Sequence, residues 1–165
     1  MWFIDLILRI LSFLFNFKSI RKTSKKVYKN KTFQMYGNEN SGKKSIINSL
    51  KTYSDFNNVN IQIGKLDDKN NFDEYDGIIF VIDSTKLEKL EKIEEKIKSA
   101  IKENSLILIL ANKTDIAGSA LRDDVINALN LRDFQDNKNI KLYMSSILQN
   151  HGYNSGIKWL ISKTM

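Results

Sequence analysis

Two uninterrupted apolar runs constrain the fold of this chain more than any other feature. Residues 77–82 (Gly-Ile-Ile-Phe-Val-Ile) and 106–110 (Leu-Ile-Leu-Ile-Leu) contain no polar side chain. A strand that is apolar on both faces has to be covered on both faces, which is typical of a parallel sheet between two layers of helices. Residues 86–103, between the two runs, carry leucine and isoleucine at helical spacing with glutamate and lysine between them.

Shorter patterns of both kinds alternate along the chain from residue 32 onward. They predict strands at 32–36, 59–63 and 140–144, and helices at 43–52, 121–130 and 153–163. We expect the polar stretch 65–76 to form a mobile surface loop. The alternation predicts an α/β fold with a mostly parallel sheet and helices on both faces, in which ligands bind at the carboxyl ends of the strands.

The composition suits one domain and excludes several kinds of site. The 165 residues are 42% hydrophobic and 27% charged, which is enough for a single domain with a sizeable core. The chain has no cysteine, which excludes disulfides, thiolate metal ligands and cysteine nucleophiles. Its one histidine, His151, argues against a histidine-rich metal site and is expected at the surface or in a loop.

The formal net charge of +7 comes from one short segment. Residues 18–31 contain seven cations and no acid, and the remaining 19 basic residues balance the 19 acidic ones. A domain-wide basic face would leave an excess outside this segment, so we expect no nucleic-acid partner. The seven cations, called here the basic collar, are Lys18, Arg21, Lys22, Lys25, Lys26, Lys29 and Lys31.

The segment before the basic collar predicts an amphipathic helix. Twelve of the sixteen residues 2–17 are apolar, and Asp5, Arg9, Ser12 and Asn16 form one narrow polar stripe at helical spacing. Sixteen helical residues reach about 24 Å, short of the roughly 30 Å of a bilayer core. No basic region precedes the apolar run and no small-residue cleavage site follows it, as a secretory signal would require.

We therefore expect the helix to lie in a membrane interface. The adjacent lysines would then contact anionic headgroups, at about 1 kcal/mol each. A short signal anchor and a helix folded onto the protein's own core remain alternatives. Trp2 stands where myristoylation requires glycine, which excludes that anchor.

A phosphate-binding motif lies between a predicted strand and a predicted helix. The segment Gly37-Asn-Glu-Asn-Ser-Gly-Lys-Lys-Ser45 fits the pattern G-x-x-x-x-G-K. Glycines let backbone N–H groups wrap phosphates, and the lysine after the second glycine would reach the β- and γ-phosphates. The alternative is a glycine-containing turn on a lysine-rich surface. The candidate phosphate-binding residues are Asn38, Asn40, Ser41, Gly42, Lys43, Lys44 and Ser45.

A second motif, Asn112-Lys113-Thr114-Asp115, directly follows the apolar run 106–110. In an N-K-x-D loop the aspartate accepts hydrogen bonds from guanine N1 and N2, the asparagine contacts the base edge, and the lysine stem packs along the ring. Adenine would present a mismatch to the aspartate. The two motifs in this order predict a guanine-nucleotide-binding fold.

From about residue 32 onward the chain resembles the Arf/Sar branch of the small GTPases. The likeness to Sar, the GTPase that starts COPII coat assembly at the endoplasmic reticulum, rests on the apolar first helix, the missing myristoylated glycine and the ending Gly-Tyr-x-x-Gly-x-x-Trp-Leu. The resembling segments are Glu74-Tyr-Asp-Gly-Ile-Ile-Phe-Val-Ile-Asp83, Ala111-Asn-Lys-Thr-Asp-Ile-Ala-Gly118, Tyr143-Met-Ser-Ser-Ile-Leu148 and His151-Gly-Tyr-Asn-Ser-Gly-Ile-Lys-Trp-Leu160.

The resemblance implies a membrane helix at 1–17, a basic linker at 18–31 and a small GTPase domain at 32–165. It implies GTP and GDP as ligands, with Ser146 and Ile147 supporting the guanine base. It further implies attachment to the cytoplasmic face of the endoplasmic reticulum or Golgi membrane through residues 1–31, with coat proteins and exchange or activating factors as partners. Two alternatives are a non-catalytic membrane adaptor on the same fold and the β subunit of the signal-recognition-particle receptor.

The chain departs from the family at the metal site and the switches. The family has serine or threonine as a Mg²⁺ ligand after the P-loop lysine, whereas this chain has Lys44, whose ammonium repels the metal. Ser45 lies about 100° further around the helix and cannot simply substitute. No D-x-G-G segment is present, and its nearest counterpart is Gly64-Lys-Leu-Asp-Asp68. We therefore expect weakened Mg²⁺ binding and impaired hydrolysis.

Overall fold

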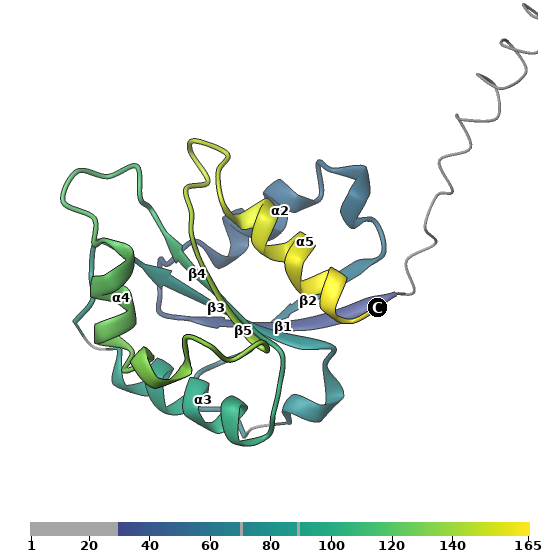
Figure 1. The fold of residues 1–165 in the computed structure, drawn as a ribbon. Helices are drawn as coiled ribbons and strands as arrows, with labels where there is room; N and C mark the ends of the chain where they lie inside the picture. The colour runs from purple at the N-terminus through teal and green to yellow at the C-terminus, as the bar shows by residue number, and fades with distance from the viewer. Residues whose placement is uncertain (1–29, 70, 89) are drawn as a thin grey trace, which may run out of the picture.

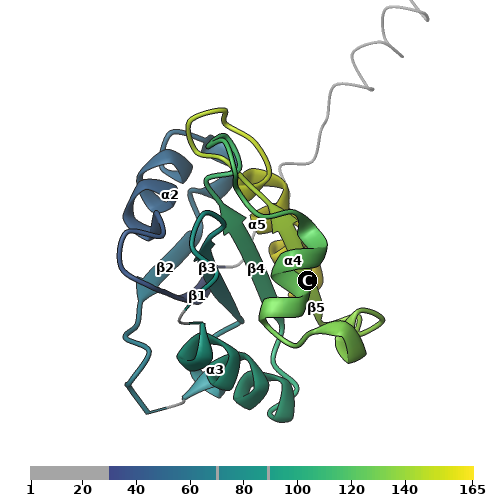
Figure 2. The same ribbon diagram turned by 90° about the vertical axis from the view of Figure 1, so that its left-hand side faces the viewer.

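Five parallel strands form the centre of the protein in this computed structural model, which describes residues 30–69, 71–88 and 90–165. They run in the order β2-β1-β3-β4-β5 across the sheet (Figures 1 and 2). Their bounds are β1 Lys31–Gly37, β2 Val59–Ile63, β3 Gly77–Asp83, β4 Ile107–Asn112 and β5 Ile140–Met144. The predicted helix at 1–17 and residues 18–29 of the predicted linker lie outside the described residues.

Helices cover both faces of this sheet. Figure 1 shows α2 (Lys43–Leu50) and α5 (Tyr153–Lys163) on one side, and α3 (Glu91–Lys102) and α4 (Arg122–Ala128) on the other. Short 3₁₀ turns at Ser54–Phe56, Phe72–Glu74 and Arg132–Phe134 complete the described elements. The predicted α/β class, with a parallel sheet between two helical layers, is confirmed.

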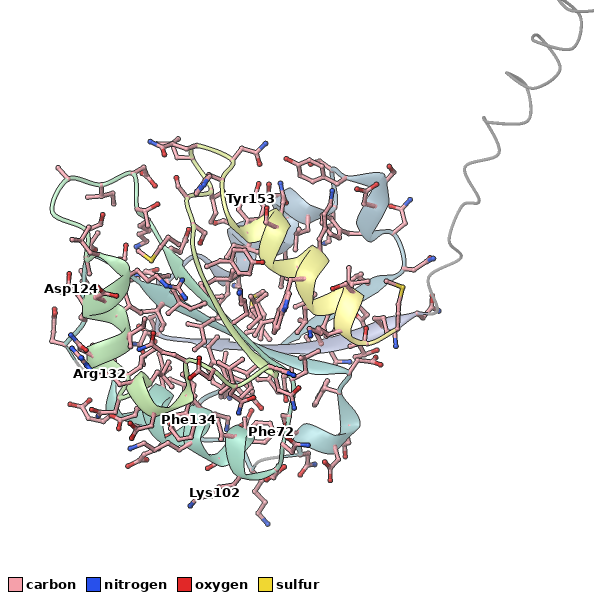
Figure 3. The ribbon with its side chains drawn as sticks, viewed as in Figure 1. Phe72, Lys102, Asp124, Arg132, Phe134 and Tyr153 are labelled. Atoms are coloured by element: carbon pink, nitrogen blue, oxygen red, sulfur yellow. The ribbon has the colours of Figure 1, made fainter. Side chains whose placement is uncertain are left out.

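The two apolar runs become the central strands β3 and β4, and every residue of both strands is buried. Alternate side chains of β3 enter opposite layers, so Ile78 and Phe80 pack under α3 and α4 while Ile79 and Val81 pack under α2 and α5. In Figure 3, Phe72 lies in the core layer under α3 and α4, and Tyr153 lies in the layer under α2 and α5. Continuous apolarity, rather than alternation, was therefore the right signal for these strands.

One predicted helix is shorter than its apolar pattern. The leucine and isoleucine spacing predicts a helix from residue 86, but α3 begins at Glu91. Asp83 accepts hydrogen bonds from the backbone and hydroxyl of Thr85, which fold the chain into a turn after β3. Leu90 is still buried in the core, because packing on the sheet does not require the helical conformation.

The polar stretch 65–76 is only partly a surface loop. Lys65, Asp67 and Asp68 are exposed, as expected, but Phe72 is 2% exposed and packs edge-on against Tyr36. The prediction is therefore wrong for the 3₁₀ turn Phe72–Glu74, which anchors the segment to the core. Lys31, the last residue of the predicted linker, begins β1 and pairs with Asp76 at 3.0 Å.

Within the part of the chain that the structure describes, no helix is long and apolar enough to cross a membrane.

Candidate functional site

The loop 38–42 joins β1 to α2 at the carboxyl edge of the sheet. Gly42 has φ of 104°, a left-handed conformation that favours glycine. A Cβ atom there would lie 2.4 Å from Nδ2 of Asn112, and one at Gly37 would lie 2.2 Å from the Val81 carbonyl oxygen. Both glycines of the motif are therefore required, because the loop packs closely against β3 and against the end of β4.

Lys43 spans this loop. Its Nζ donates hydrogen bonds of 2.7 Å to the carbonyl oxygens of Gly37 and Asn38, and its burial lowers its pKa. The first turn of α2 carries no acidic side chain and receives no side-chain cap. The backbone N–H groups at this helix end, together with the ammonium of Lys43, are therefore placed to receive an anion.

A hollow of about 520 Å³ lies against the loop. Five of the seven predicted phosphate-binding residues line it, and Ser41 and Asn38 do not. Ser41 is completely buried beneath the loop, where its carbonyl accepts a hydrogen bond from Asn112, and the Asn38 carbonyl accepts from Lys43. These two residues shape the loop. The lining residues are Glu39, Asn40, Gly42, Lys43, Lys44, Ser45 and Ile63.

Asn112 ties the second motif to the first. It ends β4, is 1% exposed, and its Nδ2 donates a 2.9 Å hydrogen bond to the carbonyl oxygen of Ser41. Its Oδ1 is buried and has no hydrogen-bond partner among the described residues. The structure thus joins two segments about 70 residues apart in sequence through one side chain.

Lys113 forms an ion pair that the sequence patterns did not predict. Its Nζ donates to Oδ2 of Asp83 at 2.5 Å, while Oδ1 of Asp83 accepts from the Thr85 amide and hydroxyl. Burial raises the pKa of Asp83, but the bonds from Lys113 and Thr85 outweigh it, so the pKa lies below its ordinary value. The carboxylate therefore stays charged and fixes the lysine stem beside the loop.

Asp115 is oriented by the loop that follows β5. The hydroxyl of Ser146 donates to Oδ1 of Asp115 at 2.5 Å, which leaves Oδ2 as a further acceptor. The backbone of Ser146 pairs with that of His151, which is exposed, as expected for this residue. Ile147 also reaches the site, because its Cδ1 lies 3.1 Å from where a Cβ of Gly42 would be. The residues predicted from the resemblance thus meet both motifs.

Three site residues were missed at the sequence level. Glu39 and Ile63 line the hollow, and Asp83 holds Lys113. Asp83 could have been found, because it ends the apolar run of β3 and lies beside Asn112 in the sheet register. Ile63 could not, since its place depends on how far β2 extends along β1.

The residues of the site do not fit a tightly held Mg²⁺ ion. Lys44 occupies the position of the metal-binding hydroxyl and is exposed at the hollow, where Glu39 is the one acidic lining residue among those described. In residues 30–69, 71–88 and 90–165, no group of three or more His, Asp or Glu side chains is placed to hold a metal.

The arrangement is the fold of the small GTPases, with two loops meeting at the carboxyl edge of one parallel sheet. The sequence model of the ADP-ribosylation factor family matches residues 62–164, more than half of the chain, and the chain belongs to this family. The match begins within β2, so the loop 38–42 lies outside it and rests on its own geometry.

Individual relatives agree with this assignment. The chain is 32% identical over 97 residues to ADP-ribosylation factor-like protein 2 of Arabidopsis thaliana, which covers 56% of this chain and 52% of the relative. It is 32% identical over 87 residues to ADP-ribosylation factor K of Dictyostelium discoideum, covering 50% and 46%. It is 27% identical over 99 residues to ADP-ribosylation factor-like protein 3 of Chlamydomonas reinhardtii, covering 58% and 55%. The chain spans about half the length of these curated relatives.

Proposed function

We propose that this protein binds guanine nucleotides at the junction of its two loops. The observation that supports the proposal is the hydrogen bond from Asn112 Nδ2 to the Ser41 carbonyl oxygen, which joins the N-K-x-D motif to the loop 38–42. Oδ2 of Asp115 is the acceptor for guanine N1 and N2, and the Ser146 hydroxyl orients that carboxylate through Oδ1. Ile147 packs beside the base from the loop after β5.

The phosphates occupy the hollow beside α2. On binding, Lys43 exchanges its two backbone carbonyl partners for phosphate oxygens, which are better partners for an ammonium ion. The N–H groups of the first turn of α2 add a favourable dipole. Lys44 also lines the hollow, so it contributes a second positive charge.

Hydrolysis is slow in this proposal and Mg²⁺ contributes little. Phosphoryl transfer depends on a metal and on residues that position water, and the described lining of the hollow supplies neither a metal-binding hydroxyl after Lys43 nor a set of carboxylates. Binding of the nucleotide, rather than its turnover, is the activity that the residues support.

In the cell, we propose a Sar-like role at the cytoplasmic face of the endoplasmic reticulum or Golgi membrane. Residues 1–17 would lie in the membrane interface, the basic collar would contact anionic lipids, and the domain 32–165 would recruit coat proteins and exchange or activating factors. The support is the sequence pattern of residues 1–31 and the Sar-like ending. A second candidate, a non-catalytic membrane adaptor, is favoured by Lys44 and the absent D-x-G-G segment.

The substitution Asp115→Asn tests the nucleotide assignment. An amide cannot accept both guanine N–H groups as a carboxylate does, so GDP affinity should fall about 100-fold, measured by titration of a fluorescent GDP analogue. Xanthine presents an acceptor where guanine has an amine, so the fluorescent XDP analogue should gain affinity. Asp123→Asn, at an exposed position on α4, is the control. Unchanged GDP affinity in the Asp115 variant would refute the assignment.

A further inference from the structure

Among the strands that the structure describes, none pairs with the outer edge of β2. β2 lies at one edge of the sheet (Figure 2). Its hydrogen bonds to β1 include one from the Lys31 N–H to the Asn58 carbonyl, at 2.9 Å, and one from the Gly64 N–H to the Met35 carbonyl, at 3.0 Å. In a parallel ladder, the N–H and C=O of one residue point the same way and alternate residues face the partner. The backbone groups of Val59, Ile61 and Ile63 therefore point outward.

This edge lacks the protection found at the opposite edge of the sheet. The sequence of β2, Val-Asn-Ile-Gln-Ile, contains no charge and no proline. On β5, by contrast, Lys141 is exposed and Arg122 donates a 2.8 Å hydrogen bond to the Leu142 carbonyl. Uncharged edge strands with free backbone groups pair with strands of other chains unless they are blocked.

Apolar surface adjoins the free edge. A hollow of about 220 Å³ lies beside β2 on the α2 side, and its lining includes Ile47, Phe56 and Val59. At the end of the strand, Ile63 is 43% exposed, which is unusual for a large hydrophobic residue. A partner strand at this edge would cover these side chains as well as the free backbone groups.

We propose that two copies of this chain pair through β2, antiparallel and about a two-fold axis at Ile61. In this register Val59 lies opposite Ile63 of the partner subunit, and Asn60 lies opposite Gln62 of the partner subunit. Every pair is matched, β-branched with β-branched and amide with amide, and no charge is buried. The outward backbone groups form about six hydrogen bonds between the strands.

Self-complementarity is what favours a second copy over a different protein. A two-fold interface uses one patch twice, so each residue of β2 has to be compatible with the residue that the reversed strand places opposite it. Val-Asn-Ile-Gln-Ile meets this condition about its central residue. The pairing shares Ile63 with the lining of the hollow but involves neither Lys43 nor Asp115, and its tests below measure self-association and not nucleotide binding.

A single cysteine tests the register directly, because the natural chain contains none. In the proposed pair the Cα atoms of the two residues 61 are about 5.5 Å apart, within disulfide range. Full-length Ile61→Cys should form a disulfide-linked dimer on mild oxidation at micromolar concentration. Lys141→Cys, on the other edge strand, is the control and should form no disulfide-linked dimer, because the proposed pair does not bring the two residues 141 together. Equal cross-linking of the two variants would overturn the proposal.

Charge exchange tests it without cysteine. One full-length variant carries Asn60→Lys with Gln62→Lys, and the other carries Asn60→Glu with Gln62→Glu, so each faces like charges across its own two-fold axis. Each should sediment as a monomer, while an equimolar mixture should form the dimer. Gln135→Lys with Ser155→Lys, at exposed positions away from β2, is the charge-matched control and should dimerise as the natural chain does.

Two results of this experiment would overturn the proposal. One is that the natural chain stays monomeric up to about 100 µM, roughly ten times the dissociation constant of about 10 µM that we expect for the pair. This result would indicate that β2 binds another protein or nothing. The other is a dimer that persists unchanged in both charge variants, because it would place the interface on a different surface.

Discussion

At the scale of single residues, Lys44 departs most clearly from what a nucleotide-binding loop requires. It lies on the rim of the hollow beside Ser45, where an ammonium ion repels a divalent cation but attracts phosphate. We therefore expect Lys44 to favour binding of the nucleotide without a metal. This consequence follows from one side chain and can be tested at that side chain.

Replacing Lys44 by threonine should make nucleotide binding depend on Mg²⁺. The new hydroxyl supplies a metal ligand and the repelling charge is lost. The ratio of GTP affinities with and without Mg²⁺, measured by fluorescence titration, should rise at least about tenfold over that of the natural chain. Lys51→Thr, at the other end of α2, should leave the ratio unchanged. An unaltered ratio in the Lys44 variant would contradict this explanation.

The raised pKa of Tyr36 should make the protein less stable at alkaline pH. Burial, followed by the nearby Tyr75 and Asp68, raises the pKa of Tyr36 to about 12, while an unfolded tyrosine ionises near 10. The unfolded chain therefore releases this proton first, and the contribution of Tyr36 is complete below pH 10 and lost between pH 10 and 12.

The Tyr36→Phe substitution isolates this effect. At pH 8 the free energy of unfolding of the natural protein, measured in urea, should exceed that of the Tyr36→Phe variant by about 1 kcal/mol. The reason is that the Tyr36 hydroxyl donates a 2.6 Å hydrogen bond to the Gln34 side chain. As the pH rises from 10 to 12, the free energy of unfolding of the natural protein should fall by up to about 3 kcal/mol relative to that of the variant. A difference that stays constant over this range would show that the phenol is not perturbed.

At the scale of elements, α3 holds the segment 64–69 against the fold. Lys96 is 4% exposed, and its Nζ donates to the carbonyl oxygens of Leu66 at 3.1 Å and Asp68 at 2.9 Å. The same ammonium lies 4.5 Å from the centre of the Tyr36 ring. Burial lowers the pKa of Lys96, so its bonds to the segment offset a desolvation cost.

Lys96→Met should release this segment while keeping the length of the side chain. We expect the free energy of unfolding to fall by about 1–2 kcal/mol and amide hydrogen exchange in residues 65–69 to accelerate. Lys92→Met removes the exposed pair with Asp67 and should cost less than about 0.5 kcal/mol. Equal effects of the two substitutions would contradict a special role for Lys96.

The elements were predictable from sequence where one local pattern decided them. β3, β4 and α5 follow from apolar runs and helical spacing, and the site motifs follow from residues adjacent in sequence. The start of α3, the burial of Phe72 and the pair of Lys113 with Asp83 depend on contacts between distant segments. Sequence periodicity carries no information about such contacts, which explains why these features were missed.

At the scale of the whole molecule, the net charge of +7 equals the charge of the basic collar. Lys31 belongs to β1, where it pairs with Asp76 and donates to the Thr164 carbonyl. The other six cations of the basic collar precede the described residues. A test of membrane attachment should therefore change those six residues and leave Lys31 intact.

Replacing the other six collar residues by glutamine should weaken binding to anionic vesicles by at least about 100-fold at low salt. GDP affinity should not change, because none of the six residues belongs to the two predicted nucleotide-binding motifs. Six exposed lysines of the domain replaced together form the matched control, which should retain vesicle binding. That control changes Lys69, Lys86, Lys102, Lys138, Lys141 and Lys163. Loss of vesicle binding in both variants would indicate a general charge effect.

The central claim, that this chain binds guanine nucleotides, is tested most directly by titrating the purified full-length protein with fluorescent GDP, GTP and ADP analogues. Each titration is run with Mg²⁺ and with EDTA. Our account predicts saturable binding of both guanine nucleotides, at least about 100-fold weaker binding of the adenine nucleotide, and little change on removal of Mg²⁺. The absence of saturable guanine-nucleotide binding under both conditions would contradict it.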